Sequence, residues 1–562
     1  MKKILTLLSL FAVAVCTFAQ TFTIDDLTYA VLSEEDKTAQ VVNGQNATGD
    51  VVVPETVTYE EVTYSVPEIS YGAFQSNSNI TSIAAPSIIT INDYAFEGCT
   101  SLTSFRFPNV ANIRYGVFQG CGAIEEAILP KVETIGGWAF VGQYSEEDWQ
   151  YHSALKRLDL SSVKTIESGA FYHCSDISSL RIGSVDQWCQ VNFGDGNANP
   201  LQETFQAVTL YVGDSETPAK DLVAASTLTE IPSYAFCRVS NIESFSAPAA
   251  INIGSSAFRG SALTSVNLPA ATTIGSYAFQ GCESLEEAIM PKVETIGQGS
   301  FSRSAITSVN LPAATTIGSD AFQGCESSEE AIMPKVETIG QGSFSRSAIT
   351  SVNLPAATSI GDAAFASCTS LASINLPAAT TIGSGAFQGC ESLEEAIMPK
   401  VETIGNWAFG YLSYYDENGN YVQRNCKSLK RLDLSSVKSI EFNAFEQCSN
   451  ISSLRIGSVD QWCQVNFGDG NANPLQQTSQ AVTLYVGDSE TPAKDLVASN
   501  ALTEIPNYAF YRISDIESFS APAATSIGDA AFASCTSLTS IDFPVATNIG
   551  SSAFSGTALT SV

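Results

Sequence analysis

The sequence predicts a β-rich repeat solenoid with coils of about 22 residues. Two observations predict this fold class: a phenylalanine recurs at a nearly fixed period, and each repeat opens with the apolar–polar alternation of a short strand. A third is that one repeat carries too few apolar side chains to offset the entropy of ordering its backbone. Each coil is therefore expected to be stable only when it is stacked on its neighbours.

Phenylalanine, usually after alanine, marks one position of the repeat in eighteen copies. Most neighbouring copies are 22 residues apart, and three pairs are 21 apart. A period this constant indicates one structural unit per repeat. The eighteen residues are Phe74, Phe96, Phe118, Phe140, Phe171, Phe236, Phe258, Phe279, Phe301, Phe322, Phe344, Phe365, Phe387, Phe409, Phe445, Phe510, Phe532 and Phe554.

Residues 371–390 show the unit clearly. The opening Leu-x-x-Ile-x-Leu ends in strand-like alternation, and Pro377 follows with no N–H to continue a ladder of hydrogen bonds. One coil is thus expected to supply one short strand and then turn. The side chains expected to face inward are Leu371, Ile374, Leu376, Ala379, Ile382, Ala386, Phe387 and Cys390.

The order of these motifs resembles that of the BspA-like leucine-rich-repeat surface proteins of bacteria. The resemblance rests on Leu-x-x-Ile-x-Leu-Pro, then Ile-Gly, then Ala-Phe-x-x-Cys, and it covers almost everything from about residue 66 to residue 562. It implies a right-handed leucine-rich-repeat superhelix. It also implies a non-enzymatic, adhesin-like protein that binds extracellular-matrix or cell-surface proteins.

The chain is expected to have three parts. Residues 1–19 are predicted to be a signal peptide, because Lys2 and Lys3 precede an apolar run and small residues precede a cleavage point after Ala19. Residues 20–68 lack the repeat and are predicted to form a β-rich N-terminal cap. Residues 69–562 are predicted to form the solenoid, which ends inside a repeat. The protein is therefore expected to be exported and secreted or held at the cell surface, and no other run is long enough for a transmembrane segment.

Four irregular segments interrupt the period: residues 141–153, 178–232, 410–428 and 452–506. The second and fourth are nearly duplicated at an offset of 274 residues, and we expect each to hold degenerate coils and a bulged loop. The first and third are aromatic and acidic insertions. Insertions in solenoids map to exposed loops, often on a binding face.

Charge and composition exclude several classes of function. The 26 basic and 58 acidic residues give a formal charge of −32, which would repel a phosphate backbone, so nucleic acid is not an expected partner. His173 lies beside Cys174, but chain neighbours rarely face each other as a nucleophile and base must. Asp195 opens a calcium-loop-like run that fails at Pro200, where such a loop needs glycine. We predict no catalytic, cofactor-binding or metal site, hence no enzyme and no cofactor.

Nine cysteines lie three residues after the phenylalanine. Export would permit disulfides, and Cys99 with Cys121 or Cys368 with Cys390 fall in consecutive coils. Serine takes the same position in several coils, however, which a packing role tolerates and a redox or zinc role does not. Reduced core thiols are the favoured interpretation. The nine are Cys99, Cys121, Cys174, Cys282, Cys325, Cys368, Cys390, Cys448 and Cys535.

Two groups of outward side chains are candidates for partner binding. The first is a row of isoleucines on the strand face, for which β-propensity on a half-exposed sheet is the alternative explanation. The second is formed by aromatic residues of the insertions, which could instead stack on sugars and make the protein a glycan-binding or structural envelope component. The candidates are Ile128, Ile289, Ile332 and Ile397 in the row, and Tyr144, Trp149, Tyr151, Tyr411, Tyr414, Tyr415 and Tyr421 in the insertions.

Two details of the strands give further expectations. Arg157 with Asp159, and Arg431 with Asp433, are predicted to be solvent-exposed cross-strand charges. Residues 279–317 and 322–360 are almost identical in sequence, but Ser328 stands where the first copy has the core residue Leu285. A locally weakened layer is expected there.

Overall fold

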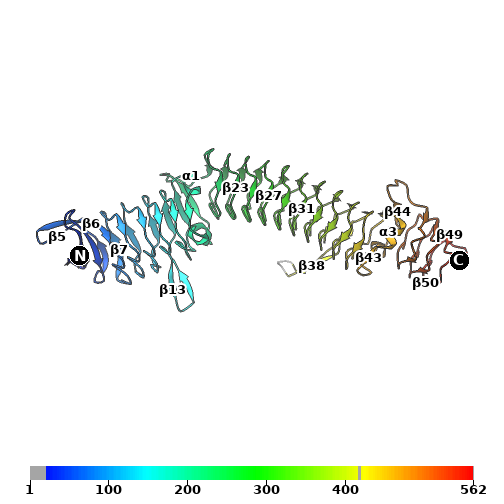
Figure 1. Cartoon of the computed structure of the whole chain (residues 1–562), viewed down its shortest axis with the longest axis horizontal. Coiled ribbons are helices and arrows are strands. Elements are labelled where there is room, and N and C mark those ends of the chain that lie inside the picture. Colours follow the sequence, from blue (N-terminus) through cyan, green and yellow to red (C-terminus); the bar gives the residue numbers. More distant parts are fainter. Residues whose placement is uncertain (1–19, 416–418, 561–562) are drawn as a thin grey trace, which may run out of the picture. The chain divides into compact units, whose positions relative to one another are not determined.

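The computed structural model describes residues 20–415 and 419–560. The predicted signal peptide, residues 1–19, lies outside the described residues. The chain divides into two compact units: unit 1 is Met1–Gln206 with Tyr211–Ser215, and unit 2 is Ala207–Leu210 with Glu216–Val562. In each unit, successive strands run side by side like rungs (Figure 1).

Unit 1 begins with six strands that lack the repeat. They are β1 (Thr21–Ile24), β2 (Leu27–Ser33), β3 (Thr38–Asn43), β4 (Gly49–Val52), β5 (Thr56–Tyr59) and β6 (Val62–Ile69). Strand β2 pairs antiparallel with β1 and β3, whereas β6 pairs in parallel with the first short strand of the coils. Phe22 packs its ring 4.5 Å from that of Tyr59 and is buried. This part of unit 1 therefore covers the first open edge of the stacked coils.

Each coil of unit 1 supplies one longer strand and one two-residue strand, and both kinds pair in parallel with their equivalents. The longer strands are β7 (Ile80–Ala84), β9 (Ser104–Arg106), β11 (Glu126–Ile128), β15 (Arg157–Leu160) and β17 (Ser179–Ile182), and β19 (Thr209–Val212) follows at the boundary of the units. The short strands are β8 (Thr90–Ile91), β10 (Asn112–Ile113), β12 (Thr134–Ile135), β16 (Thr165–Ile166) and β18 (Asn192–Phe193).

Unit 2 repeats this two-strand coil over a longer run. Its longer strands are β20 (Asp221–Val223), β22 (Ser244–Ser246), β24 (Ser265–Asn267), β26 (Glu287–Ile289), β28 (Ser308–Asn310), β30 (Glu330–Ile332), β32 (Ser351–Asn353), β34 (Ser373–Asn375), β36 (Glu395–Ile397), β40 (Arg431–Leu434), β42 (Ser453–Ile456), β44 (Thr483–Val486), β45 (Asp495–Val497), β47 (Ser518–Ser520) and β49 (Ser540–Asp542).

The short strands of unit 2 form an 11-stranded and a 3-stranded parallel sheet. They are β21 (Glu230–Ile231), β23 (Asn252–Ile253), β25 (Thr273–Ile274), β27 (Thr295–Ile296), β29 (Thr316–Ile317), β31 (Thr338–Ile339), β33 (Ser359–Ile360), β35 (Thr381–Ile382), β37 (Thr403–Ile404), β41 (Ser439–Ile440), β43 (Asn466–Phe467), β46 (Glu504–Ile505), β48 (Ser526–Ile527) and β50 (Asn548–Ile549).

The repeated phenylalanines form a stacked column inside the coils. The rings of Phe301 and Phe322 are 5.4 Å apart and 3° from parallel, and the next ring, Phe344, follows at 5.1 Å. All eight side chains predicted to face inward in residues 371–390 are at most 2% exposed. The predicted repeat solenoid and its inward register are thereby confirmed.

The Ile-Gly step after each short strand lets the coils approach closely. A Cβ atom at Gly318 would lie 2.7 Å from the carbonyl carbon of Gly297 in the preceding coil. Real side chains do not tolerate such a distance to a backbone atom, so glycine is needed where two coils touch at this turn.

The cysteines of the repeat are packed inside the stack. All thirteen within residues 20–415 and 419–560 are free thiols, and only Cys463 is not fully buried. The Cys390 thiol donates a hydrogen bond to the carbonyl oxygen of Phe365 at 3.1 Å, and the other repeat cysteines do the same to their own preceding coil. Where serine replaces cysteine, as at Ser347, its hydroxyl lies 3.4 Å from the next thiol. Packing and local hydrogen bonding thus explain both residue types at this position.

These thiols should be inert in the native protein at neutral pH. Burial raises the pKa of Cys282, Cys325 and Cys368 from 9.0 to about 11. Because the fold favours the neutral thiol, this stabilisation is complete below about pH 9 and is lost as the pH rises towards 11. Iodoacetamide at pH 8 is expected to alkylate these three cysteines only after unfolding in urea, as read by mass spectrometry. Their rapid alkylation in the native chain would place them outside the core.

The duplicated irregular segments differ from the expected bulged loops, because each contains short helices. These are α1 (Val185–Cys189), the 3₁₀ helix η1 (Gly196–Ala198), α2 (Pro200–Glu203), α3 (Val459–Cys463) and α4 (Pro474–Gln477). The Ser184 hydroxyl caps α1 by accepting a hydrogen bond from the Gln187 N–H. Each five-residue helix buries one tryptophan, Trp188 or Trp462, with 0% exposure. Helix formation places this large apolar side chain in the core, which an open loop would not do.

Candidate functional site

The outward face of the longer strands carries the predicted isoleucine row. Ile128 and Ile289 are 44% and 45% exposed, whereas Ile332 and Ile397 are half-buried. The row is interrupted by Asn267 and Asn310, which take the outward position in the intervening coils. The structure therefore leaves the isoleucines as separate apolar points on a polar face.

Two of the isoleucines begin a ladder of unlike side chains across neighbouring strands. In unit 2, Ile397 lies opposite Asp433, Asp433 opposite Arg455, and Arg455 opposite Tyr485. In unit 1, Ile128 lies opposite Asp159, and Asp159 lies opposite Arg181. We call these the unit 2 ladder and the unit 1 ladder.

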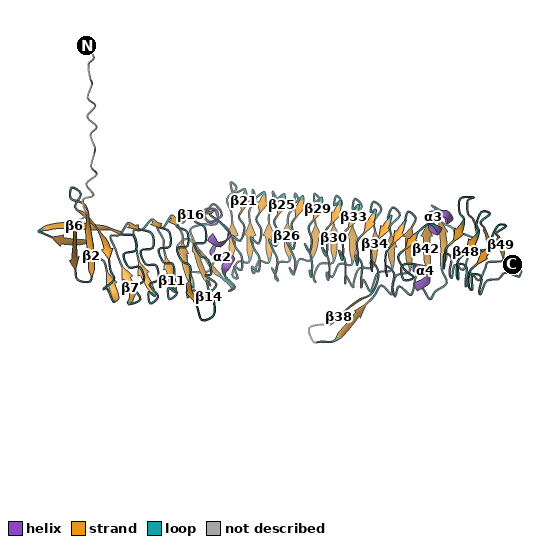
Figure 2. Ribbon diagram, turned by 60° about the horizontal axis from the view of Figure 1, so that its bottom comes forward, coloured by secondary structure: helices purple, strands orange, loops and turns teal. Residues whose placement is uncertain are grey.

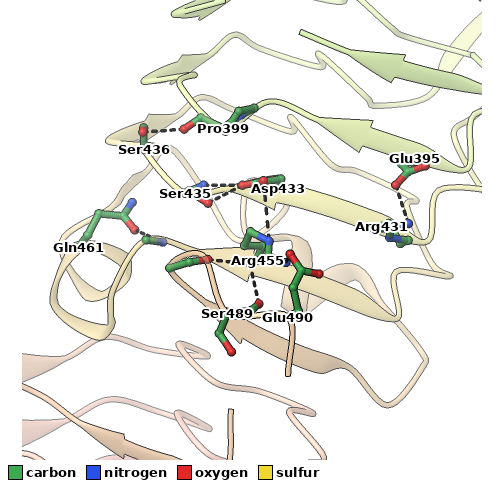
Figure 3. Close-up of polar contacts among 12 residues, drawn as sticks. Glu395, Pro399, Arg431, Asp433, Ser435, Ser436, Arg455, Gln461, Ser489 and Glu490 are labelled. Atoms are coloured by element: carbon green, nitrogen blue, oxygen red, sulfur yellow. Dashed lines mark hydrogen bonds and ion pairs between the residues drawn. The ribbon is translucent and has the colours of Figure 1, made fainter. Parts of the chain in front are cut away.

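Arg455 is fixed in place at the centre of the unit 2 ladder (Figure 3). Its Nη1 donates hydrogen bonds to the carbonyl oxygens of Gly487 at 2.6 Å and Ser489 at 2.8 Å. Its Nε lies 3.9 Å from Asp433 Oδ2, and its guanidinium lies 5.3 Å from the centre of the Tyr485 ring. A cation held by backbone carbonyls over an aromatic face keeps one geometry, so little side-chain entropy remains to be lost on binding.

The prediction about the cross-strand charges is wrong in its pairing. Arg431 forms its ion pair with Glu395 at 2.7 Å, and Arg157 pairs with Glu126 at 2.8 Å. Asp433 is only 8% exposed and faces Arg455 of the following coil. The reason is that outward residues two apart on one strand are farther from each other than from the strands on either side.

A surface hollow of about 390 Å³ lies beside the unit 2 ladder. Ile397, Arg431, Asp433, Arg455 and Tyr485 are among the residues that line it. The lining thus combines aliphatic side chains, cations, the carboxylates of Asp433 and Glu490, and an aromatic ring in one shallow site, a combination suited to a polar protein surface.

The unit 1 ladder repeats this construction. Arg181 Nη1 donates to the carbonyl oxygens of Gly213 at 2.7 Å and Ser215 at 2.8 Å, and its guanidinium lies 5.2 Å from the centre of the Tyr211 ring. Its Nε lies 3.8 Å from Asp159 Oδ2. The chain therefore holds two copies of one arrangement, 274 residues apart.

The first aromatic insertion forms a hairpin in unit 1, β13 (Gln143–Ser145) with β14 (Gln150–His152). Tyr144 lies opposite Tyr151, at a ring separation of 5.2 Å. Tyr144 is 43% and Trp149 79% exposed, whereas Tyr151 is half-buried and stacks on His173. The hairpin thus exposes two of the three predicted rings, Trp149 more than Tyr144.

The second insertion forms a hairpin that leaves the stack of unit 2, β38 (Leu412–Tyr415) with β39 (Tyr421–Arg424) (Figure 2). Tyr415 and Tyr421 are 72% and 59% exposed and meet edge to face. Tyr414 is half-buried instead, because Arg346 lies 5.7 Å from its ring centre and Arg424 Nε donates to its hydroxyl at 3.3 Å. Tyr411 is also half-buried. The structure therefore divides these four residues into an exposed pair and an anchoring pair.

The residues considered as candidates for catalysis or calcium binding make structural contacts instead. His173 stacks on Tyr151, and burial raises the pKa of Cys174 to about 12, so this pair has no activated nucleophile. Asp195 accepts a hydrogen bond from the Gly169 N–H at 3.1 Å, which ties the irregular segment to a coil. Among the residues that the structure describes, no three His, Cys, Asp or Glu side chains are grouped to hold a metal ion.

Coils with one longer strand, a parallel ladder and a stacked phenylalanine core define a leucine-rich-repeat solenoid protein. The family model described as "BspA type Leucine rich repeat region (6 copies)" matches residues 67–195, 215–329, 294–416, 413–469 and 490–562. The chain belongs to this family, as the resemblance of its motifs predicted. Within the described parts of the chain, no helix is both long and apolar enough to cross a membrane.

Solved structures that are similar to this chain include bacterial proteins. A leucine-rich repeat protein from Bacteroides ovatus is 19% identical, with 95% of this chain and 92% of that chain covered and a TM-score of 0.30. A leucine rich cell surface protein from Faecalibacterium prausnitzii is 18% identical, with 93% and 95% covered and a TM-score of 0.27. The pneumococcal vaccine antigen PcpA is 15% identical, with 84% and 99% covered and a TM-score of 0.27. No curated protein matches the chain.

Proposed function

We propose that this chain is a non-enzymatic, adhesin-like protein, secreted or held at the cell surface, that binds an extracellular-matrix or cell-surface protein. The observation that carries the proposal is the ladder of Ile, Asp, Arg and Tyr, which is built in both units on the outward face of the longer strands.

The chemistry of the ladder suits a protein partner. Arginine and tyrosine are the residue types that most often dominate the energy of protein interfaces. Arg455 is already held by the carbonyl oxygens of Gly487 and Ser489, so it needs no rearrangement to meet a partner. Two copies of the site on one chain would also allow bivalent attachment to a surface that displays many partner molecules.

Binding of the exported chain to immobilised fibronectin, laminin and collagen tests the proposal. We expect one of these proteins to bind, and the double variant Tyr211→Ala with Tyr485→Ala to lose about tenfold or more in affinity. Tyr421→Ala, in the hairpin β38–β39, is the matched control and should bind like the wild type. Circular dichroism would verify that each variant is folded.

Three results would contradict the proposal. One is that none of the three matrix proteins binds. Another is that the double variant binds as tightly as the wild type. The third is that replacing residues 410–428 by a Gly-Ser linker abolishes binding while the double variant retains it, because the hairpin and not the ladder would then hold the partner.

A further inference from the structure

A second surface feature, unrelated to the strand ladders, runs along unit 1. Three tyrosines in successive coils meet edge to face: Tyr71 and Tyr94 at a ring separation of 5.7 Å, and Tyr94 and Tyr115 at 5.5 Å. Trp138 occupies the next coil and meets Tyr172 at 5.8 Å. We call these five residues the aromatic ridge.

Three of the five rings of the ridge lie across a glycine of the following coil. A Cβ atom at Gly116 would be 2.8 Å from the Tyr94 ring, and one at Gly137 would be 3.3 Å from the Tyr115 ring. A Cβ atom at Gly169 would be 3.4 Å from the indole of Trp138. The missing side chains thus leave room for the rings.

The fold itself does not require aromatic residues in the ridge. Tyr94 and Trp138 have φ angles of 57° and 59°, a left-handed conformation that is costly for bulky side chains. In unit 2 the same position, also at positive φ, is held by small residues in some coils, such as Gly299, Gly342 and Ala363, and by aromatic residues in others, such as Tyr277 and Trp407. Small residues satisfy the turn, so the rings call for another explanation.

The ridge is accessible and has polar neighbours. Tyr71 is 63% and Tyr115 41% exposed, and the other rings are half-buried. The Gln75 amide donates to the Glu97 carboxylate at 2.5 Å in the turns beside the rings. Burial raises the pKa of the Tyr94 hydroxyl, and Tyr115 and Glu97 add to this effect. The surface therefore pairs apolar ring faces with amide and carboxylate groups.

We propose that the aromatic ridge binds a neutral glycan chain. Sugar rings offer C–H faces that pack on aromatic rings, and hydroxyl groups that donate to carboxylates and amides. The formal charge of −32 disfavours nucleic acids and acidic glycans. A protein hot spot would instead need surrounding apolar side chains that exclude water, and the ridge is bordered by glycines and polar residues.

The ridge is long enough for several sugar units. From Tyr172 the ring contacts continue to Tyr151 at 6.1 Å, and from there to Tyr144 in the hairpin β13–β14 at 5.2 Å. Successive coils rise by about 4.8 Å, comparable to the advance of one sugar in an extended chain. An oligosaccharide, and not a single sugar, is therefore the expected ligand. This role is separate from the proposed protein binding, since the ridge follows the short strands and the ladders lie on the longer ones.

An array of neutral and acidic hexasaccharides tests the proposal. The neutral set would contain β-glucan, chitin and mannan fragments, and the acidic set galacturonate and sulfated fragments. We expect a neutral hexasaccharide to bind, and the variant Tyr71→Ala with Tyr115→Ala to weaken its affinity by about tenfold or more in titration calorimetry. Tyr277→Ala is the matched control: its ring also lies on a glycine, Gly299, but makes no ring contact among the described residues.

The outcomes separate this proposal from the proposed function. The ridge variant should still bind the matrix protein, and the variant at Tyr211 and Tyr485 should still bind the glycan. Three results would overturn glycan binding at the ridge: no neutral hexasaccharide binds, acidic ones bind better, or the ridge variant binds as the wild type does. Circular dichroism on both variants would show that the fold is retained.

Discussion

Phe322→Ala is expected to lower the free energy of unfolding of unit 2 by about 3–5 kcal/mol. Phe322 is 2% exposed and lies between the rings of Phe301 and Phe344 in the stacked column. Removing the Phe322 ring leaves a cavity between stacked coils. Since each coil is stabilised mainly by packing on its neighbours, the lost stability comes from the contacts between coils. Unfolding in urea, followed by circular dichroism, would measure the effect.

The matched control for this variant is Tyr415→Ala, because Tyr415 also lies in unit 2 and is 72% exposed. It should change the free energy of unfolding by less than about 1 kcal/mol. Since repeat arrays can lose cooperativity, the core variant is also expected to broaden or divide the unfolding transition. Equal behaviour of the two variants would mean that the phenylalanine column does not hold the coils together.

Ser328→Leu is expected to raise the free energy of unfolding by about 2–3 kcal/mol. Ser328 is 1% exposed, and its hydroxyl oxygen has no hydrogen-bond partner. Leu285 and Leu393 hold the same position in other coils with 0% exposure. The leucine would fill the layer and remove a buried polar group, so both changes act in the same direction. Thermal and urea unfolding would measure the gain.

A neighbouring serine provides the control for the second variant. Ser327 is exposed in the same turn, so Ser327→Leu should not raise stability. If Ser328→Leu left stability unchanged or lowered it, residue 328 would not face the core, and the inward register of the repeat would be wrong in this coil.

The fold was predictable because its main contacts are periodic. The column at Phe301, Phe322 and Phe344 and the inward residues of residues 371–390 follow directly from the repeat. The place of Cys426 did not follow, since it is 17 residues after Phe409. The hairpin β38–β39 is inserted between Phe409 and Cys426 and returns the chain to the coil. The Cys426 thiol then donates a hydrogen bond to the Phe387 carbonyl oxygen, as the other repeat cysteines do in their coils. The run Cys426-x-x-Leu429, the same as Cys-x-x-Leu in regular coils, was the available signal.

The short helices also had a signal in the sequence. Ser184 is followed three residues later by Gln187, whose side chain accepts a hydrogen bond from the Gly183 N–H, a variant of the capping box. Asn199 before Pro200 is a second helix start. These helices have only four or five residues, so they lack the apolar periodicity on which longer helices are recognised.

The candidate sites were predicted only in part. The outward position of Ile128 and Ile289 followed from strand alternation. The hydrogen-bond partners of Arg455 could not be predicted, because the Gly487 and Ser489 carbonyls come from a coil of irregular length. The aromatic ridge was missed for a related reason: Tyr71 and Tyr115 precede the phenylalanine by three residues and Tyr94 by two, so the rings share no single register.

We infer that stacking of the coils holds the protein together. Hydrogen exchange of the native chain, read by mass spectrometry, tests this inference most directly. The Phe279, Phe301 and Phe322 amides each donate to a carbonyl of the following coil at 2.7–2.8 Å. We predict that peptides with these amides exchange far more slowly than those of the hairpin β38–β39, which pairs only with itself. Exchange of the phenylalanine peptides as fast as that of the hairpin would contradict the account.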